Sequence, residues 1–240
     1  MTASAQTLHL RPTAPLAERV LLPGDPGRAL RLAQELLSEP RMFNHHRGLW
    51  GYTGTAADGA PLTVQSTGMG GPSVAIVVHE LVALGAQRLL RVGTCGAFGE
   101  GLELGALLLA TAALPEDGAS RALGASGPVA PSEKLLSALL AAGGDRLARG
   151  LIVSTDLFYD ERAPERAWRE AGALAVEMES ATLFVLAARL RVEAASILVV
   201  SDRLDGPRER IAEEALHEAE LTMGRLAAAA LGSVGDSPDE

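Results

Sequence analysis

The segment 19-RVLLPGDPGRALRLAQELL-37 determines the fold class that the rest of the chain supports. Arg19–Leu22 is a short apolar run with the length of a strand, and a turn rich in proline and glycine follows it. Residues 27–37 then predict a helix, because their apolar side chains fall on one broad face. A strand, a turn and a helix in this order form the basic unit of an α/β protein.

Arg28 lies in the first turn of this predicted helix. The helix dipole favours an anion there, so an arginine is unfavourable by roughly a few tenths of a kcal/mol. One interpretation is that the loop binds an anion, held by Arg28 together with N–H groups that the glycines leave accessible. The other is an ordinary strand-to-helix connection whose arginine extends into solvent. The segment alone leaves both open.

The alternation of strands and helices continues along the chain. Strands are predicted at residues 50–56, 62–66, 89–93, 150–155, 174–176 and 194–201. Helices are predicted after 68-GMGGPS-73 and at residues 163–171, 178–189 and about 208–231. The Asp58-Gly59 dipeptide predicts a hairpin between the first two of these strands.

We therefore expect a single α/β domain over residues 1–231, with a central mixed sheet flanked by helices. The loop-rich segment 115–132 is not a clear linker, and neither a shift in composition nor an internal repeat marks a boundary. Residues 232–240 are expected to form a disordered tail.

Composition limits the function. The net charge of −9 argues against a broad surface for nucleic acid or an anionic membrane, although local arginines can still hold a small anion. Cys95 is the single cysteine, which excludes an internal disulfide and a cysteine zinc cluster, and no other metal-ligand spacing occurs. Residues 1–15 lack a signal-peptide core, and the apolar run 104–114 is too short to span a bilayer. We expect a cytoplasmic protein.

Ligands of such sheets bind at the carboxyl ends of strands, and polar residues gather there. Arg91 ends one strand and leads into 93-GTCGAFG-99, whose Thr94 hydroxyl and N–H groups can contact an anion, although such a segment is often only a tight turn. Cys95 has no evident histidine or asparagine partner, so a small buried side chain is the favoured interpretation over a nucleophile.

Two further strand ends carry carboxylates. Glu177 and Glu179 flank Met178 where a strand meets a helix, and they can cap that helix or accept hydrogen bonds from vicinal hydroxyls. Ser201 and Asp202 end an apolar strand, where Asp202 can be a helix cap or a general acid. The shared position at strand ends predicts one common site.

Six segments together carry a resemblance: PGDPGR at 23–28, HRGLWGYTG at 46–54, STGMGGPS at 66–73, RVGTCG at 91–96, VEMES at 176–180 and VVSD at 199–202. In order and spacing they resemble the hexameric purine nucleoside phosphorylase and uridine phosphorylase family, over nearly the whole chain. The resemblance implies the nucleoside phosphorylase fold. It also implies that Gly24 and Arg28 bind phosphate, which favours the first interpretation of Arg28.

The resemblance implies roles for further residues. Phosphate contacts are Gly24, Arg28, Arg91, Thr94 and, from a neighbouring subunit, Arg47. Ribose contacts are Met69, Glu177, Met178, Glu179 and, across a dimer interface, His9. Base contacts are Phe158, which stacks on the purine, and Ser201 with Asp202. Asp202 corresponds to the catalytic proton donor to purine N7.

The implied reaction is phosphorolysis of purine ribonucleosides or deoxyribonucleosides, with inorganic phosphate as co-substrate and no cofactor. The implied assembly is a homohexamer, built as a trimer of dimers with sites shared across the dimer interface. A purine preference follows because 158-FYDERAPER-166 has no glutamine, which the uridine branch uses, and because that branch lacks Asp202. The choice among adenosine, inosine and guanosine stays open.

One position departs from the family pattern. The helical arginine that assists the aspartate in purine members is replaced by Ala215, and only Arg208 and Arg210 lie nearby in sequence. Either arginine can take its place, or the acid can act unassisted. Three alternatives remain: uridine phosphorylase, a nucleosidase of the same superfamily that uses water, and a non-catalytic nucleotide-binding protein. The phosphate-site arginines argue against the nucleosidase, and the combination of Asp202 with Glu179 argues against the binding protein.

Overall fold

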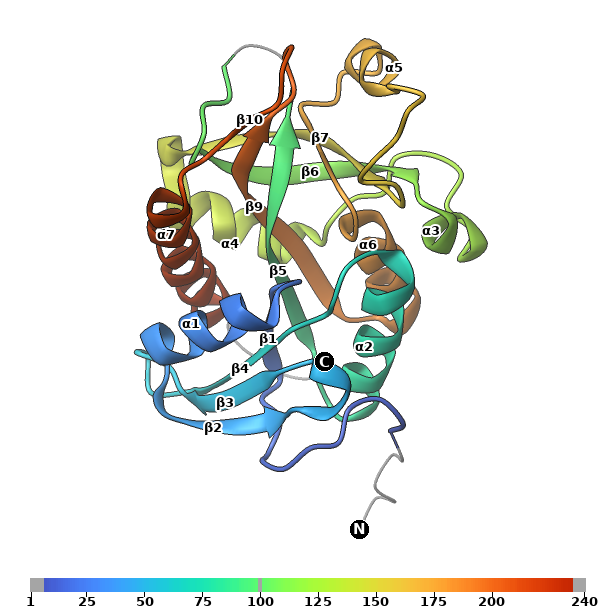
Figure 1. The fold of residues 1–240 in the computed structure, drawn as a ribbon. Helices are drawn as coiled ribbons and strands as arrows, with labels where there is room; N and C mark the ends of the chain where they lie inside the picture. Colours follow the sequence, from blue (N-terminus) through green and yellow to red (C-terminus); the bar gives the residue numbers. More distant parts are fainter. Residues whose placement is uncertain (1–6, 99–100, 235–240) are drawn as a thin grey trace.

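The computed structural model of the chain describes residues 7–98 and 101–234 (Figure 1). The strands are β1 (Arg19–Leu22), β2 (Ser38–Asn44), β3 (Gly51–Thr55), β4 (Pro61–Gln65), β5 (Arg88–Ala97), β6 (Leu107–Glu116), β7 (Leu147–Thr155), β8 (Ala175–Glu177), β9 (Glu193–Arg203) and β10 (Glu209–Arg210). The α-helices are α1 (Pro26–Leu36), α2 (Gly71–Ala83), α3 (Gly118–Ala122), α4 (Glu133–Gly143), α5 (Glu165–Glu170), α6 (Ser180–Leu190) and α7 (Glu213–Ser233). Short 3₁₀ turns occur at His46–Gly48 and Gly144–Arg146.

Within the described residues, the ten strands belong to one mixed sheet. Strand β1 is parallel to β4 and β5, and β5 is parallel to β9, whereas β2, β3 and β4 pair antiparallel. The end of β5 also pairs with β8, so β5, β9, β6, β7 and β8 close into a ring of paired strands. The predicted α/β fold with a central mixed sheet flanked by helices is confirmed.

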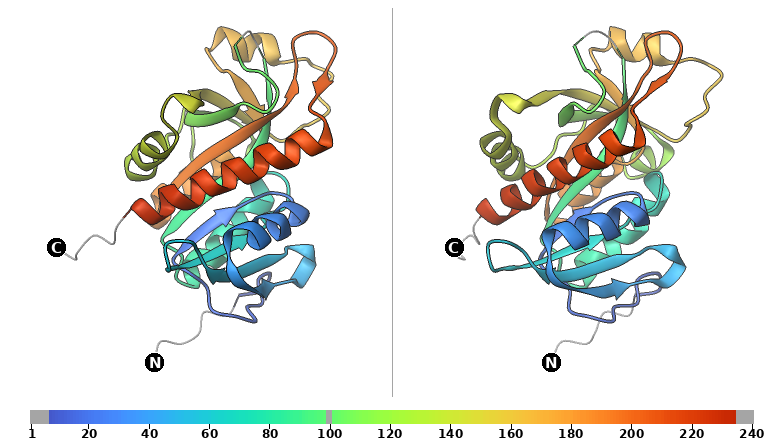
Figure 2. Two further views of the ribbon diagram at one scale, coloured as in Figure 1. Left: turned by 90° about the vertical axis from the view of Figure 1, so that its left-hand side faces the viewer. Right: turned by 60° about the vertical axis from the view of Figure 1, so that its left-hand side comes forward.

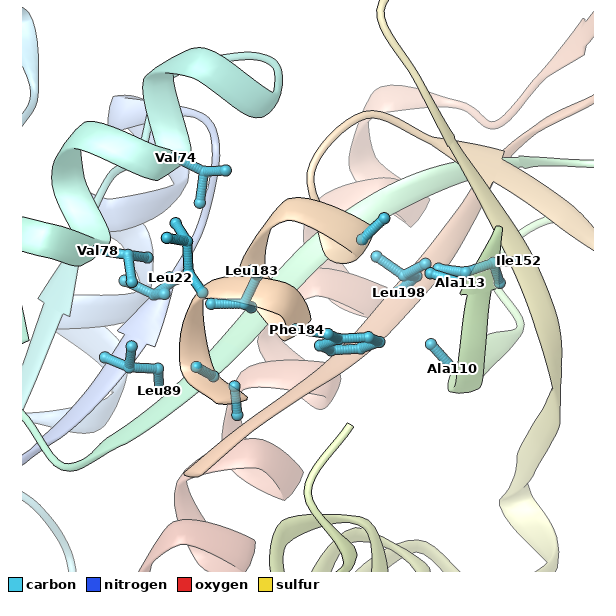
Figure 3. Close-up of a cluster of buried hydrophobic side chains, with 14 of the residues drawn as sticks. Leu22, Val74, Val78, Leu89, Ala110, Ala113, Ile152, Leu183, Phe184 and Leu198 are labelled. Carbon is cyan, nitrogen blue, oxygen red and sulfur yellow. The ribbon is translucent and has the colours of Figure 1, made fainter. Parts of the chain in front are cut away.

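Helices cover both faces of the sheet, as two turned views show (Figure 2). Helices α1, α4 and α7 contribute to one apolar cluster, and α2 and α6 contribute to the other. Neighbouring strand residues alternate between the two clusters: Leu21 belongs to the first and Leu22 to the second. Figure 3 shows Leu22 beside Val74 and Val78 of α2, with Leu183 of α6 close by. Strand β1 is therefore buried on both faces, which explains its continuous apolar run.

Most predicted elements agree with the structure, and β1 has the predicted bounds. The hairpin of β3 and β4 turns at Asp58 and Gly59 as predicted. Strands β2 and β6 and helices α3 and α4 were not predicted; β6 covers most of the apolar run 104–114.

The prediction of a helix from residue 208 was wrong at its start. Glu209–Arg210 instead form β10, paired antiparallel with β9, and α7 begins at Glu213. Two glutamates in the first turn of α7 complement the helix dipole and mark this start. The helix continues to Ser233, two residues into the predicted tail, and residues 235–240 lie outside the described part. Within the described part, no helix is both long and apolar enough to cross a membrane.

Candidate active site

A cavity of about 670 Å³ opens where β1, β5, β7 and β9 end. Its lining contains most of the site residues predicted from the sequence: Gly24, Arg28, Met69, Arg91, Thr94, Phe158, Glu177, Met178, Glu179, Ser201 and Asp202. The fold therefore brings together residues from five of the six motifs, and Phe158 joins them from the loop after β7. His9 and Arg47 are described by the structure but do not line this cavity.

Arg28 lies at the cavity end formed by the β1–α1 turn. Asp25 caps α1, since its carboxylate accepts the N–H groups of Gly27 and Arg28 at 3.1 and 2.7 Å. The buried Arg28 side chain donates through Nε to Glu220 of α7 at 2.7 Å. The carboxylate of Glu220 thus offsets the unfavourable placement of a cation in the first helical turn. No local sequence signal pointed to Glu220, because it lies 192 residues away.

Arg91 lies between two carboxylates on the cavity floor. Its Nε is 2.9 Å from Glu177 Oε2, and its Nη2 is 2.6 Å from Glu179 Oε2. The side chain folds back over Gly93, where a Cβ atom would stand 2.6 Å from Nη2. Glycine is therefore required at position 93 for Arg91 to reach both glutamates.

The two glutamates play different structural roles. Glu177 accepts the N–H groups of Glu179 and Ser180 at 3.0 Å and the Ser154 hydroxyl, so the capping interpretation holds for it. Glu179 makes no side-chain cap and accepts the N–H of Gly70 in addition to its contact with Arg91. Burial raises the pKa of Glu179. The charge of Arg91 acts against this shift, and the charge of Glu177 adds to it. Glu179 is therefore the carboxylate presented to the cavity.

Asp202 lies within β9, so the interpretation of this residue as a helix cap was wrong. Its Oδ2 accepts the Ser201 hydroxyl at 2.7 Å. Its Oδ1 is buried and accepts no hydrogen bond of ordinary geometry from the described residues. The nearest cations are Arg210 and Arg208, whose Nε atoms lie 3.2 and 3.6 Å from Oδ1. Both arginines were predicted from the sequence as possible partners of Asp202, and the structure places both next to its carboxyl group.

An aromatic side chain borders the same end of the cavity. Phe158 is 49% exposed and meets Tyr159 edge-on, with ring centroids 5.0 Å apart. The guanidinium carbon of Arg208 lies 4.4 Å from the centroid of the Phe158 ring. Three apolar residues that were not predicted from the sequence also line this part of the cavity: Leu157, Trp168 and Leu204. They give it an apolar wall next to the carboxyl of Asp202.

His9 and Arg47 lie on segments away from the cavity. The His9 ring Nδ1 is 2.8 Å from Glu80 of α2, whose carboxylate also accepts backbone N–H groups of residues 8–10. Arg47 is exposed in a 3₁₀ turn and adopts a left-handed φ of 59°. Neither residue therefore lines the cavity of its own chain.

Fold and cavity together define an α/β protein with a concave site that combines paired arginines and carboxylates with an apolar, aromatic wall. A sequence model of the phosphorylase superfamily matches residues 18–236, and the chain belongs to this superfamily. The resemblance seen in the six motifs is thereby confirmed.

Several relatives carry the name purine nucleoside phosphorylase DeoD-type. The protein of Geobacillus kaustophilus is 38% identical over 208 residues, covering 84% of this chain and 88% of the relative. The protein of Alkaliphilus metalliredigens is 39% identical over 206 residues, covering 83% and 88%. The protein of one Clostridium perfringens strain is 40% identical over 207 residues, covering 83% and 87%.

Cys95 lines the cavity but is held as a neutral thiol. It is buried, and its Sγ lies 3.7 Å from the Val199 carbonyl oxygen. Burial raises the pKa of the thiol, and the charge of Glu177 adds to this effect. A thiol nucleophile needs the opposite shift, so the interpretation as a small buried side chain is favoured.

We expect the folded protein to resist a thiol-specific disulfide reagent at pH 8, and the urea-unfolded protein to react fully. The thiol has a higher pKa in the folded protein than in the unfolded chain. It therefore adds its full share to the free energy of unfolding at pH values below the unfolded pKa of about 8.5. That contribution is lost as the pH rises above this value. Urea titrations from pH 7 to 10 should show the decline, and Cys95→Ala should lessen it. Rapid labelling of the folded protein would contradict this assignment.

Proposed function

We propose that the protein catalyses phosphorolysis of purine ribonucleosides and deoxyribonucleosides, a purine-salvage reaction, releasing the free base and (deoxy)ribose 1-phosphate. The observation that carries the proposal is the single cavity that holds Arg28 and Arg91 together with Glu179 and Asp202. The names of the relatives agree with this reaction. Each part of the cavity has a defined chemical task in the proposed reaction.

Phosphate is the nucleophile in the proposed reaction. It lies against Arg28, Arg91, Thr94 and the N–H of Gly24, whose donors match its oxygens. One phosphate oxygen forms a bond to C1′ as the bond from C1′ to N9 of the base breaks. The sugar passes through an oxocarbenium-like state, and the neighbouring phosphate anion stabilises its positive charge.

The sugar lies between the phosphate and the base. The Glu179 carboxylate accepts hydrogen bonds from the ribose hydroxyls, while Met178 and Met69 border the ring. Glu177 was predicted as a further ribose contact, but its carboxylate is engaged by Arg91, Ser154 and two backbone N–H groups. We therefore assign Glu177 the task of holding Arg91 and the start of α6 in place behind the sugar.

The base stacks on Phe158, and Asp202 donates a proton to N7 as the bond to N9 breaks. Protonation turns a poor anionic leaving group into a neutral purine. Arg210, the nearer cation to Asp202 Oδ1, stabilises the carboxylate that remains. Ser201 fixes the other carboxyl oxygen.

Phosphate dependence tests this function directly. The protein is incubated with inosine, with and without inorganic phosphate, and hypoxanthine and ribose 1-phosphate are quantified. We expect equal amounts of both products with phosphate and neither without it. Free ribose formed without phosphate would identify a nucleosidase, and cleavage of uridine alone would identify a uridine phosphorylase. Binding of nucleoside without any cleavage would identify a binding protein.

Arg91→Lys keeps the charge but loses the planar guanidinium that spans two partners. We expect the KM for phosphate to rise roughly tenfold or more, the factor for a lost charge-assisted hydrogen bond. Initial rates over a range of phosphate concentrations measure this. Arg189→Lys, at the exposed end of α6, is the control and should leave the KM unchanged. An unaltered KM in Arg91→Lys would place the phosphate elsewhere.

Asp202→Asn preserves size but cannot donate a carboxyl proton. We expect turnover of inosine and adenosine to fall by about a hundredfold or more, the range for a lost general acid. A nucleoside whose base is already cationic, such as 7-methylguanosine, does not need this proton and should keep most of its rate. Loss of all substrates alike would indicate damage to the fold, and parental rates on inosine would refute the role of Asp202.

The proposed assembly is a homohexamer built as a trimer of dimers, in which His9 and Arg47 complete the site of a neighbour. Exposed apolar side chains on nearby segments support it, among them Leu8 (70% exposed) and Met69 (83% exposed). Their burial against a second copy would remove apolar surface from water.

Shared sites predict complementation between two inactive variants. Arg47→Ala lacks the residue given to the neighbour, and Asp202→Asn lacks the acid of its own site. We expect activity to return when the two variants are unfolded together and refolded as mixed oligomers, because some sites then contain both native residues. Sedimentation velocity would establish the size of the active species. An active monomer, or mixed oligomers without recovered activity, would refute the shared site.

A further inference from the structure

The hairpin of β9 and β10 carries two arginines, Arg208 and Arg210, that reach into the base end of the cavity. Arg210 is the cross-strand partner of Asp202, so the two side chains project from the same face of the hairpin. The next residue extends the pairing, because the Ile211 N–H donates to the Ser201 carbonyl at 3.0 Å. The backbone therefore sets Arg210 opposite the acid.

The turn between the two strands is anchored on both sides. The Leu204 N–H donates to the Ala97 carbonyl at 2.8 Å, and the Leu204 side chain packs over Gly96. Asp205 pairs with Arg169 of α5 at 2.6 Å and lies 3.8 Å from Arg203. These contacts join the hairpin to β5 and α5, the elements that border the cavity.

The two guanidinium groups differ in what they contact. Arg210 Nε is the closer cation to Asp202 Oδ1, at 3.2 Å against 3.6 Å for Arg208. Arg208 also stacks on Phe158, with its guanidinium carbon 4.4 Å from the ring centroid. Phe158 lies in the loop after β7, is half exposed and otherwise meets the exposed ring of Tyr159, so this cation–π contact restrains a ring on the protein surface.

We propose that the two arginines are positioning residues with separate tasks: Arg210 orients and stabilises the carboxyl of Asp202, and Arg208 fixes the ring of Phe158 relative to that carboxyl. The proposal rests on the proposed phosphorolysis of nucleosides. A base needs the aromatic ring and the acid at one fixed separation, since it must stack on the first while its N7 meets the second. The bridge that Arg208 makes between Phe158 and Asp202 sets this separation.

The separate tasks predict different kinetic signatures. Loss of Arg210 removes the charge that favours the carboxylate formed after proton transfer, so kcat should fall while KM for the nucleoside changes little. Loss of Arg208 leaves proton transfer intact but lets Phe158 move, so KM should rise for every nucleoside while kcat changes little.

The experiment compares Arg208→Met and Arg210→Met with the parent protein on inosine and 7-methylguanosine at saturating phosphate. We expect Arg210→Met to lower kcat on inosine roughly tenfold or more and to spare 7-methylguanosine, which needs no proton. We expect Arg208→Met to raise KM for both nucleosides roughly threefold or more, the range of a lost cation–π contact. Arg166→Met, an exposed arginine of α5, is the matched control and should match the parent protein.

Lysine variants sharpen the distinction. Arg210→Lys keeps a charge near Asp202 and should recover part of kcat, whereas Arg208→Lys lacks the flat group that stacks and should resemble Arg208→Met. A common effect of both methionine variants would overturn the division of tasks. A lower KM in Arg208→Met would overturn it too, because Arg208 would then occupy the place of the base. If the parent protein itself does not cleave inosine, the proposed function fails instead.

Discussion

The cavity depends on one buried ionic cluster, in which Arg91 joins Glu177 and Glu179. The cluster connects β5 to the junction of β8 and α6, and through Glu177 and Glu179 it also reaches Ser154 of β7 and the N–H of Gly70 before α2. Removing one partner of a buried ion pair typically costs about 3–5 kcal/mol, since the remaining charge stays in the interior without compensation. A cluster under this constraint has little freedom, and so the strand ends around it keep fixed positions. An anion that binds Arg91 competes with Glu179 and, in the proposed reaction, releases that carboxylate toward the sugar.

A similar pairing explains the arginine in the first turn of α1. The sequence showed an unfavourable cation and allowed either a bound anion or exposure to solvent, and the structure excludes exposure because Arg28 is buried. The structure also shows that Arg28 pairs with Glu220 of α7, which neither interpretation had predicted. Glu220 holds Arg28 by Nε, and it accepts Arg31 on its other oxygen at 2.7 Å. The carboxylate thus fixes the direction of Arg28 without enclosing its whole guanidinium group.

The sequence predicted those features that depend on residues close together in the chain. The bounds of β1, the turn at Asp58 and Gly59, and the gathering of motifs at strand ends all follow from local patterns and from the direction of parallel strands. It did not predict β6 from the apolar run 104–114, because a short apolar run has no periodicity that separates a buried strand from other buried segments. Nor did it predict Glu220, since a single glutamate on a long helix carries no local sign of a partner 192 residues away.

The region after Asp202 shows most clearly where local patterns mislead. The sequence predicts that residues 208–212 begin a long helix, but two of them pair with β9. Helix α7 starts only at Glu213, the first of the two glutamates in its first turn. This difference changes the chemistry of the site. On a helix starting at residue 208, Arg208 and Arg210 would point about 160° apart around the axis, so the two could not face one carboxyl group. In the hairpin, strand pairing sets Arg210 opposite Asp202 and the turn brings Arg208 over Phe158. Two cations therefore reach the acid because the chain turns back along β9 before it enters the helix.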